Sequence, residues 1–282
     1  MARKNIFDVA SDSLDIRNEA SRIVKMFYED DSLYFRNSGY TLVEYVEAFA
    51  FEEWKWRGHF IDVDDFLDSV GFDDIVNRCS FMDIEAFFLL VELVYNFWEL
   101  ANRDLTSDHS ELAWGGNFFH LEHVMNDNLQ KYNHKAYKHD DRVLIIEDKP
   151  EITAVAEIVE ENLATQVIRY NHRSLKGDLD SKKQILIVLG AELEPKRKSL
   201  QELNKQLSED IFFMLNNIDI RHNNRNPMDP SKYKEFVYKM DNDQLEEWYD
   251  ELYQMMLLAI LLLDNVDRCA KVKDLKSSII EE

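Results

Sequence analysis

Residues that break helices are scarce in this chain. Its 282 residues include only 7 glycines and 4 prolines, whereas β-sandwiches and barrels use many of both in their turns. With 45% hydrophobic and 31% charged residues, the composition is that of a globular protein. The sequence therefore predicts an all-α fold of one or more multi-helix bundles. At most one short extended or β segment is expected, near residues 142–147, where β-branched residues are flanked by charge.

Cysteines and long hydrophobic runs are also few. The two cysteines, Cys79 and Cys269, lie far apart without a pairing pattern, which favours a reducing compartment. The sequence opens without an apolar signal region. Its longest apolar run, Met255 to Leu263, is about half as long as a bilayer crossing requires. We therefore expect a cytoplasmic protein that does not enter a membrane.

Basic residues are outnumbered by acidic ones. The chain has 33 Lys and Arg against 55 Asp and Glu, a net charge of −22, which repels nucleic acids and anionic membranes. Residues 165–233 are the exception, with 12 basic and 9 acidic side chains. We expect a protein partner, with RNA as the alternative through the 165–233 stretch, and a homodimer is compatible with the sequence. A further alternative is that the acidic N-terminal half mimics a nucleic acid.

Motifs of the common enzyme classes are missing. There is no Walker-type phosphate loop, GxGxxG, GxSxG, CxxC or HExxH, so no cofactor is expected. The best metal-like cluster is His120, Glu122, His123 and Asp127. On a helix, His120, His123 and Asp127 share one face, and two imidazoles with a carboxylate suit a divalent metal. Surface histidines of this kind are common and no further ligand is identifiable, so we expect no metal.

The most unusual polar run is Arg221, His222, Asn223 and Asn224, which follows an apolar helix within the basic stretch. One interpretation is a capped helix end, with Arg221 paired to Asp219 or another nearby acid. The other makes Arg221 a phosphate clamp and His222 a general base or acid, with the two asparagines orienting the substrate. Both interpretations stay open at this point.

A second Arg–His candidate is the pair Arg103 and His109, at the end of the most apolar helix of the N-terminal half. Such a pair has the residue types needed to act on a phosphodiester. The alternative is a solvated helix C-terminus, where the helix dipole favours an arginine.

Local signals also predict several element boundaries. Thr41 and Glu44 form a capping box that should open a helix running to about Arg57, and Pro150 sits where another helix begins. The last long helix should cover 243–263 and be followed by a charged tail. The polar, glycine-containing segment 105–116 is the best boundary between an acidic N-terminal helical domain, 1–110, and a C-terminal helical domain, 111–282.

Three features of residues 117–263 carry a family resemblance. A helix containing 123–129 leads into the extended segment 143–146; an apolar helix ends in the 220–224 run; and a long apolar helix lies near the C-terminus. This part of the chain resembles bacterial abortive-infection and HEPN-like helical proteins. The resemblance implies a HEPN-like helical fold.

HEPN ribonucleases are usually dimers with a metal-independent site, built from an arginine, a polar residue and a histidine four to six residues after the arginine. This sequence departs from that pattern, because His222 follows Arg221 directly and only Arg103 and His109 have the required spacing. The leading hypothesis is therefore a non-catalytic helical interaction protein linked to phage defence. The alternative is a HEPN-like ribonuclease that uses these Arg and His residues.

Overall fold

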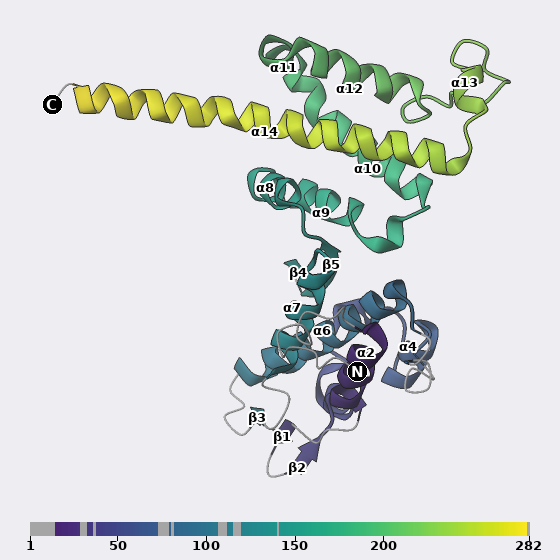
Figure 1. Cartoon of the computed structure of the whole chain (residues 1–282), viewed down its shortest axis with the longest axis vertical. Helices are drawn as coiled ribbons and strands as arrows, with labels where there is room; N and C mark the ends of the chain where they lie inside the picture. Colours follow the sequence, from purple (N-terminus) through teal and green to yellow (C-terminus); the bar gives the residue numbers. More distant parts are fainter. Residues whose placement is uncertain are drawn as a thin grey trace, which may run out of the picture. The chain divides into compact units, whose positions relative to one another are not determined.

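The chain folds as two compact units. The computed structural model describes residues 15–28, 33–35, 38–72, 79, 82–106, 112–114, 120–139 and 141–280. Unit 1 extends to Asp148, and unit 2 begins at Lys149. Both units are mainly helical (Figure 1), so the predicted all-α, multi-helix class is confirmed.

Unit 1 is organised around helix α6 (Ile84–Thr106), whose buried side chains between Phe87 and Ala101 cover most of its circumference, as in a helix surrounded by the core. Its Phe97 ring lies 5.5 Å from the ring of Phe27 on helix α2 (Ile16–Tyr28). The other described helical segments of unit 1 are α3 (Leu42–Tyr45), a π-helical turn (Val46–Ala50), a 3-10 turn (Lys55–Arg57), α4 (Val63–Ser69) and α7 (Leu121–Lys131).

The capping box predicted at the start of α3 is confirmed. The Thr41 hydroxyl accepts from the Glu44 amide at 3.2 Å, and the Glu44 carboxylate accepts from the Thr41 amide at 2.9 Å. The continuous helix expected to reach Arg57 is wrong, because α3 widens into the π-helical turn and the chain is extended at Trp54. Trp54 is buried there. Burial of this ring in the core accompanies the break, and the local helical pattern does not reveal it.

The β content is larger than expected. Strand β5 (Arg142–Glu147) coincides with the predicted segment, but it pairs antiparallel with β4 (His134–His139). Three further strands, β1 (Leu33–Phe35), β2 (Ser38–Tyr40) and β3 (Leu112–Trp114), form a second sheet in the order β2-β1-β3. The expectation of at most one β segment is therefore wrong. A strand must pair its backbone groups with those of another segment, and the local sequence of a strand does not identify that segment.

The boundary between the units also differs from the expected one. The buried side chain of Asn96 on α6 donates to the Val143 carbonyl at 2.9 Å and accepts from the Val143 amide at 2.9 Å. The Glu92 carboxylate accepts from the Ile145 amide at 2.8 Å. These bonds fasten β5 to unit 1, so the division falls between Asp148 and Lys149 rather than after residue 110. Helix α6, before the polar segment 105–116, and β5, after it, therefore belong to the same unit.

Unit 2 is a helical bundle. Its first helix begins at Pro150, as predicted. The last helix continues to Ile280, so the tail expected after Leu263 is itself helical. Among the described residues, no helix is long and apolar enough to cross a membrane. The elements of unit 2 are α8 (Pro150–Ile158), α9 (Glu161–Tyr170), a 3-10 turn (Arg173–Leu175), α10 (Leu179–Leu193), a 3-10 turn (Glu194–Lys196), α11 (Arg197–Leu203), α12 (Lys205–Asn217), α13 (Glu235–Tyr238) and α14 (Asn242–Ile280).

A buried lysine connects α10 to α14. The Lys182 ammonium lies 2.7 Å from a Glu246 carboxylate oxygen and 2.6 Å from Asp250 Oδ1. The Tyr170 hydroxyl donates to the same Asp250 oxygen at 2.8 Å, and its ring stacks on Tyr253 with a centroid distance of 4.0 Å. Burial and the neighbouring Asp250 charge raise the pKa of Tyr170 above its usual range, so its hydroxyl stays a donor.

The Glu246 carboxylate is held in its charged form. Burial by itself raises the pKa of this group, but the hydrogen bonds from Lys182 and from the Gly177 amide outweigh burial and lower the pKa below its ordinary value of 4.5. The Gly177 amide donates to Glu246 at 2.8 Å. The ion pair therefore stabilises unit 2 most when Glu246 is ionised.

Replacing Asn96 with alanine tests the attachment of β5. Asn96→Ala leaves the buried amide and carbonyl of Val143 without these partners, so the free energy of unfolding should fall by about 1–3 kcal/mol. Urea denaturation measures it. The matched control Gln130→Ala, an exposed position on α7, should change stability by less than about 0.5 kcal/mol. Equal effects of the two substitutions would contradict the role of Asn96.

The charge on Glu246 makes the free energy of unfolding depend on pH. Because its pKa is lowered in the folded state, its stabilising contribution is fully present above the ordinary carboxyl pKa and is lost as pH falls through the folded pKa. The gap in unfolding free energy between the wild type and Glu246→Gln should therefore be constant near neutral pH and should shrink below about pH 4.5. Thermal or urea unfolding across this range measures it. Glu247→Gln, at an exposed neighbouring position, should show a smaller gap at neutral pH.

Candidate functional site

The polar run after α12 is held by one buried side chain. Asn224 is only 1% exposed. Its side-chain oxygen accepts from the Asp219 amide at 2.8 Å, and its side-chain nitrogen donates to the Lys232 carbonyl at 2.7 Å. Asp219 adopts a positive φ of 65°, a conformation that Asp tolerates better than most residues. Asn224 therefore joins the two ends of this loop.

Arg221 is also engaged within the fold. Its guanidinium lies 2.7 Å from a Glu194 carboxylate oxygen and 5.7 Å from the ring centre of Phe212. A side chain at Gly190 on α10 would meet the same guanidinium, since its Cβ would lie 3.3 Å from Arg221 Nη2. The pairing of Arg221 with a nearby acid is therefore confirmed, and the acid is Glu194.

His222 lies apart from this ion pair. It is half-buried, whereas Asn223 is exposed. A small polar cavity of about 290 Å³ opens beside the His222 imidazole, and Arg221 is not among the residues that line it. The structure thus directs the arginine and the histidine to different surroundings. The cavity is lined by Asn216, Asn217, His222, Asn224, Ser231, Lys232 and Lys234.

Arg103 holds the turn between β4 and β5. Its guanidinium lies 2.9 Å from Asp141 Oδ1 and donates to the Asp141 carbonyl at 3.0 Å, while the Lys55 ammonium lies 3.1 Å from Asp141 Oδ2. The hydrogen bond from Lys55 and the charge of Arg103 lower the pKa of Asp141. His109 lies outside the described residues, so the pairing of Arg103 with His109 stays a prediction.

The metal-like cluster on α7 does not assemble into a ligand set. His123 Nε2 lies 3.3 Å from Asp127 Oδ2, and Glu122 accepts from the Tyr95 hydroxyl at 3.1 Å. His120, His123 and Asp127 line a small hollow together with Glu19, Arg22 and Lys131, and the two basic side chains oppose a cation. In the part of the chain that the structure describes, no group of three His, Cys, Asp or Glu side chains is placed to hold a metal ion.

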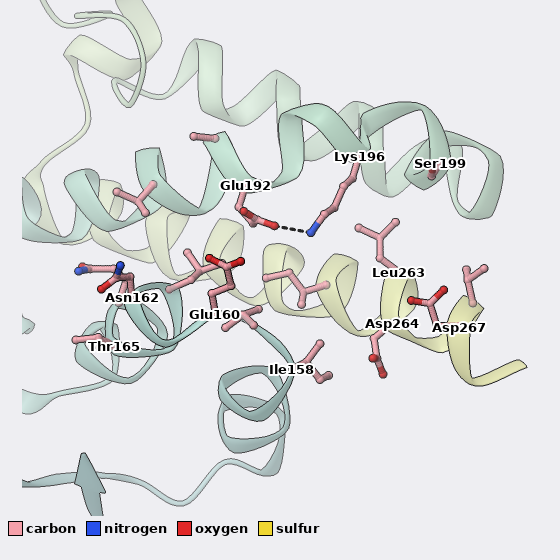
Figure 2. Close-up of a pocket in the computed structure, with 17 residues that line it drawn as sticks. Ile158, Glu160, Asn162, Thr165, Glu192, Lys196, Ser199, Leu263, Asp264 and Asp267 are labelled. Atoms are coloured by element: carbon pink, nitrogen blue, oxygen red, sulfur yellow. Dashed lines mark hydrogen bonds and ion pairs between the residues drawn. The ribbon is translucent and has the colours of Figure 1, made fainter. Parts of the chain in front are cut away.

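Unit 2 also contains a groove that no sequence motif indicated. It has a volume of about 1050 Å³ and lies between the α8–α9 junction, α10, α11 and α14. Figure 2 shows Glu160, Glu192, Asp264 and Asp267 around it, with Lys196 paired to Glu192. We name it the acidic groove. Its apolar side chains are Ile158, Val159, Leu163, Val188, Ala191, Ile260, Leu263 and Val266.

The acidic groove could not be predicted from the sequence, because its residues come from four separate segments. No two of the four carboxylates form a local pattern that differs from an ordinary solvated helix face. The sequence signal that does point to the groove is the apolar run from Met255 to Leu263, of which Ile260 and Leu263 line it.

Substitutions in the polar run separate its structural role from a catalytic one. Asn224→Ala removes two hydrogen bonds from a buried site, so the free energy of unfolding of unit 2 should fall by about 1–3 kcal/mol. His222→Ala should change it by less than about 0.5 kcal/mol, because that side chain is half-exposed. Urea denaturation compares the two variants. A larger loss of stability in His222→Ala than in Asn224→Ala would contradict this assignment.

No protein-family model, curated protein or solved structure matches the chain, so the resemblance to HEPN-like proteins stays a prediction.

Proposed function

We propose that this protein is a non-catalytic interaction protein that binds a segment of another protein in the acidic groove of unit 2. The observation that carries the proposal is the composition of the groove. Apolar side chains such as Leu163, Ile260 and Leu263 lie beside four carboxylates and a single lysine. A concave surface of this size and mixed character suits an amphipathic helix with apolar residues on one face and Lys or Arg at its margins.

The charges of the groove favour a basic partner. Glu192 is paired with Lys196, and Asp264 is paired with Arg268 of the same helix. Glu160 and Asp267 are exposed. The groove therefore presents a negative potential that attracts Lys and Arg side chains and repels nucleic acid phosphates. It differs in this respect from residues 165–233 as a whole, where basic residues predominate.

The arrangement of the candidate catalytic residues supports a binding role. Arg221 pairs with Glu194, Asn224 closes a loop, and Arg103 holds Asp141. An active site needs groups that are free to meet a substrate and close enough to act together. These three side chains instead satisfy partners in the fold.

A role in phage defence is part of the proposal, and the resemblance of residues 117–263 to abortive-infection proteins supports it. The alternative of a metal-independent ribonuclease rests on the same resemblance and on His222. The basic stretch gives it little support, since Lys182, Lys183 and Arg221 all lie within 3.3 Å of a carboxylate oxygen. Cleavage of cellular RNA in EDTA that is abolished by His222→Ala would favour the ribonuclease.

Charge reversal at the groove tests the binding proposal. The probe is a synthetic amphipathic helical peptide with Leu on one face and Lys on the other, and fluorescence anisotropy measures its binding to the full chain. Glu160→Lys/Asp267→Lys should weaken binding by roughly tenfold or more, because two attractive rim charges become repulsive.

The matched control for this experiment is Glu202→Lys/Glu247→Lys, which makes the same change of charge at exposed positions outside the groove. It should bind the peptide nearly as well as the wild type. An equal loss of binding in both variants would show that net charge alone attracts the peptide, and the groove would then lose its assigned role.

A further inference from the structure

The C-terminal part of α14 leaves the bundle. Helix α14 has 39 residues, which corresponds to a length of about 58 Å at 1.5 Å per residue. One face of its first half is buried against the other helices of unit 2, but every residue from 265 to 280 is exposed. Figure 1 shows this part running past the ends of α8 and α11.

Apolar side chains follow one another along this exposed helix with a seven-residue repeat. Val272, Leu275 and Ile279 are 49%, 59% and 62% exposed, and their spacing is that of the a and d positions of a coiled coil. The repeat extends back into the anchored part of the helix, where Leu258 is also exposed. We name this set the α14 stripe, with a positions Leu258, Asn265, Val272 and Ile279 and d positions Leu261, Arg268 and Leu275.

The α14 stripe is separate from the acidic groove. At 3.6 residues per turn its centre lies about 120° around α14 from the buried Tyr249, Met256 and Ile260. Ile260 also lines the groove. A partner in the groove and a partner on the stripe would therefore contact neighbouring faces of the helix, which meet at Asp264.

We infer that the α14 stripe pairs with the same stripe of a second copy of this chain, with the two helices antiparallel. In an antiparallel pair, each a position faces a d position of the partner. When the two helices run antiparallel with the centres of their stripes aligned, Leu258 faces the partner's Leu275 and Leu261 faces the partner's Val272. The two polar positions also meet, since Asn265 faces the partner's Arg268. The layers of Leu258 with Leu275 and of Leu261 with Val272 are thus apolar on both sides, the central layer is polar on both sides, and Ile279 faces the partner's Gln254.

The flanking charges fit the same pairing. Asp264 and Lys271 occupy the g positions beside the stripe, and the antiparallel arrangement brings Asp264 near the partner's Lys271, twice by symmetry. In a parallel pair, Arg268 would face the partner's Arg268 between the two helices. Lys271 would then lie near the partner's Lys276. Like charges at these positions disfavour it. Charge complementarity therefore selects a second copy in the antiparallel orientation.

The oligomeric state of the full-length chain tests the inference. Sedimentation velocity should show a concentration-dependent dimer for the wild type. Val272→Glu/Leu275→Glu places charges in the apolar layers and should raise the dissociation constant by roughly tenfold or more. Ala270→Glu/Ser277→Glu adds the same charges at two exposed f positions, on the side of the helix away from the stripe, and should remain dimeric. Circular dichroism and unfolding curves confirm that both variants are folded.

Disulfide cross-linking tests the orientation. A tagged chain with Asn265→Cys is mixed with an untagged chain with Arg268→Cys, both carrying Cys269→Ser. Antiparallel pairing should give a mixed disulfide of intermediate size on a non-reducing gel, whereas parallel pairing gives dimers of each variant with itself. A monomeric wild type, a dimer unaffected by Val272→Glu/Leu275→Glu, or dimers of each variant with itself alone would overturn the inference.

Discussion

The packing of unit 2 depends on a buried lysine, Lys182, and its two carboxylate partners. The Lys182 ammonium has almost no exposed surface, and it is stabilised because Glu246 and Asp250 on α14 lie within 2.7 Å of it. Removing an isolated ammonium from water is unfavourable by several kcal/mol, so α10 folds in this way only when α14 brings both carboxylates to it. The two helices therefore depend on each other. Tyr170 joins the same contact, since its hydroxyl donates to Asp250 and its ring stacks on Tyr253.

Polar residues that look catalytic in a sequence have a common structural use in this fold. Arg221, Asn224 and Arg103 each connect segments that the helices leave apart: Arg221 joins the end of α12 to Glu194, and Arg103 joins α6 to the turn at Asp141. A protein with few glycines and prolines must fix its loops with side chains instead. Asparagine and arginine have several donors or acceptors in fixed geometry, which suits them to this task.

The parts of the fold that depend on local physics were predictable from the sequence. The capping box at Thr41 and the helix start at Pro150 each involve residues within one helical turn, and both were predicted correctly. The partner of β5, the unit boundary after Asp148 and the acidic groove all depend on contacts between distant segments. The full length of α14 was missed for another reason. Asn265 and Arg268 interrupt its apolar repeat, so the segment after Leu263 has the composition of a solvated tail.

Helix α14 also has a gradient of stability along its length. Its N-terminal half is fixed by burial of Tyr249, Tyr253 and Met256, whereas residues 265–280 keep their helical form only by propagation from that anchored half. Without tertiary contacts, each added turn contributes little to the stability of the helix. The backbone amide hydrogens should therefore exchange with solvent faster toward Ile280. Any molecule that covers the exposed part must therefore also supply the free energy that orders it. The apparent affinity of such a molecule for α14 then includes the free energy of helix formation as well as that of contact. Because helix formation depends on temperature, the apparent affinity does too.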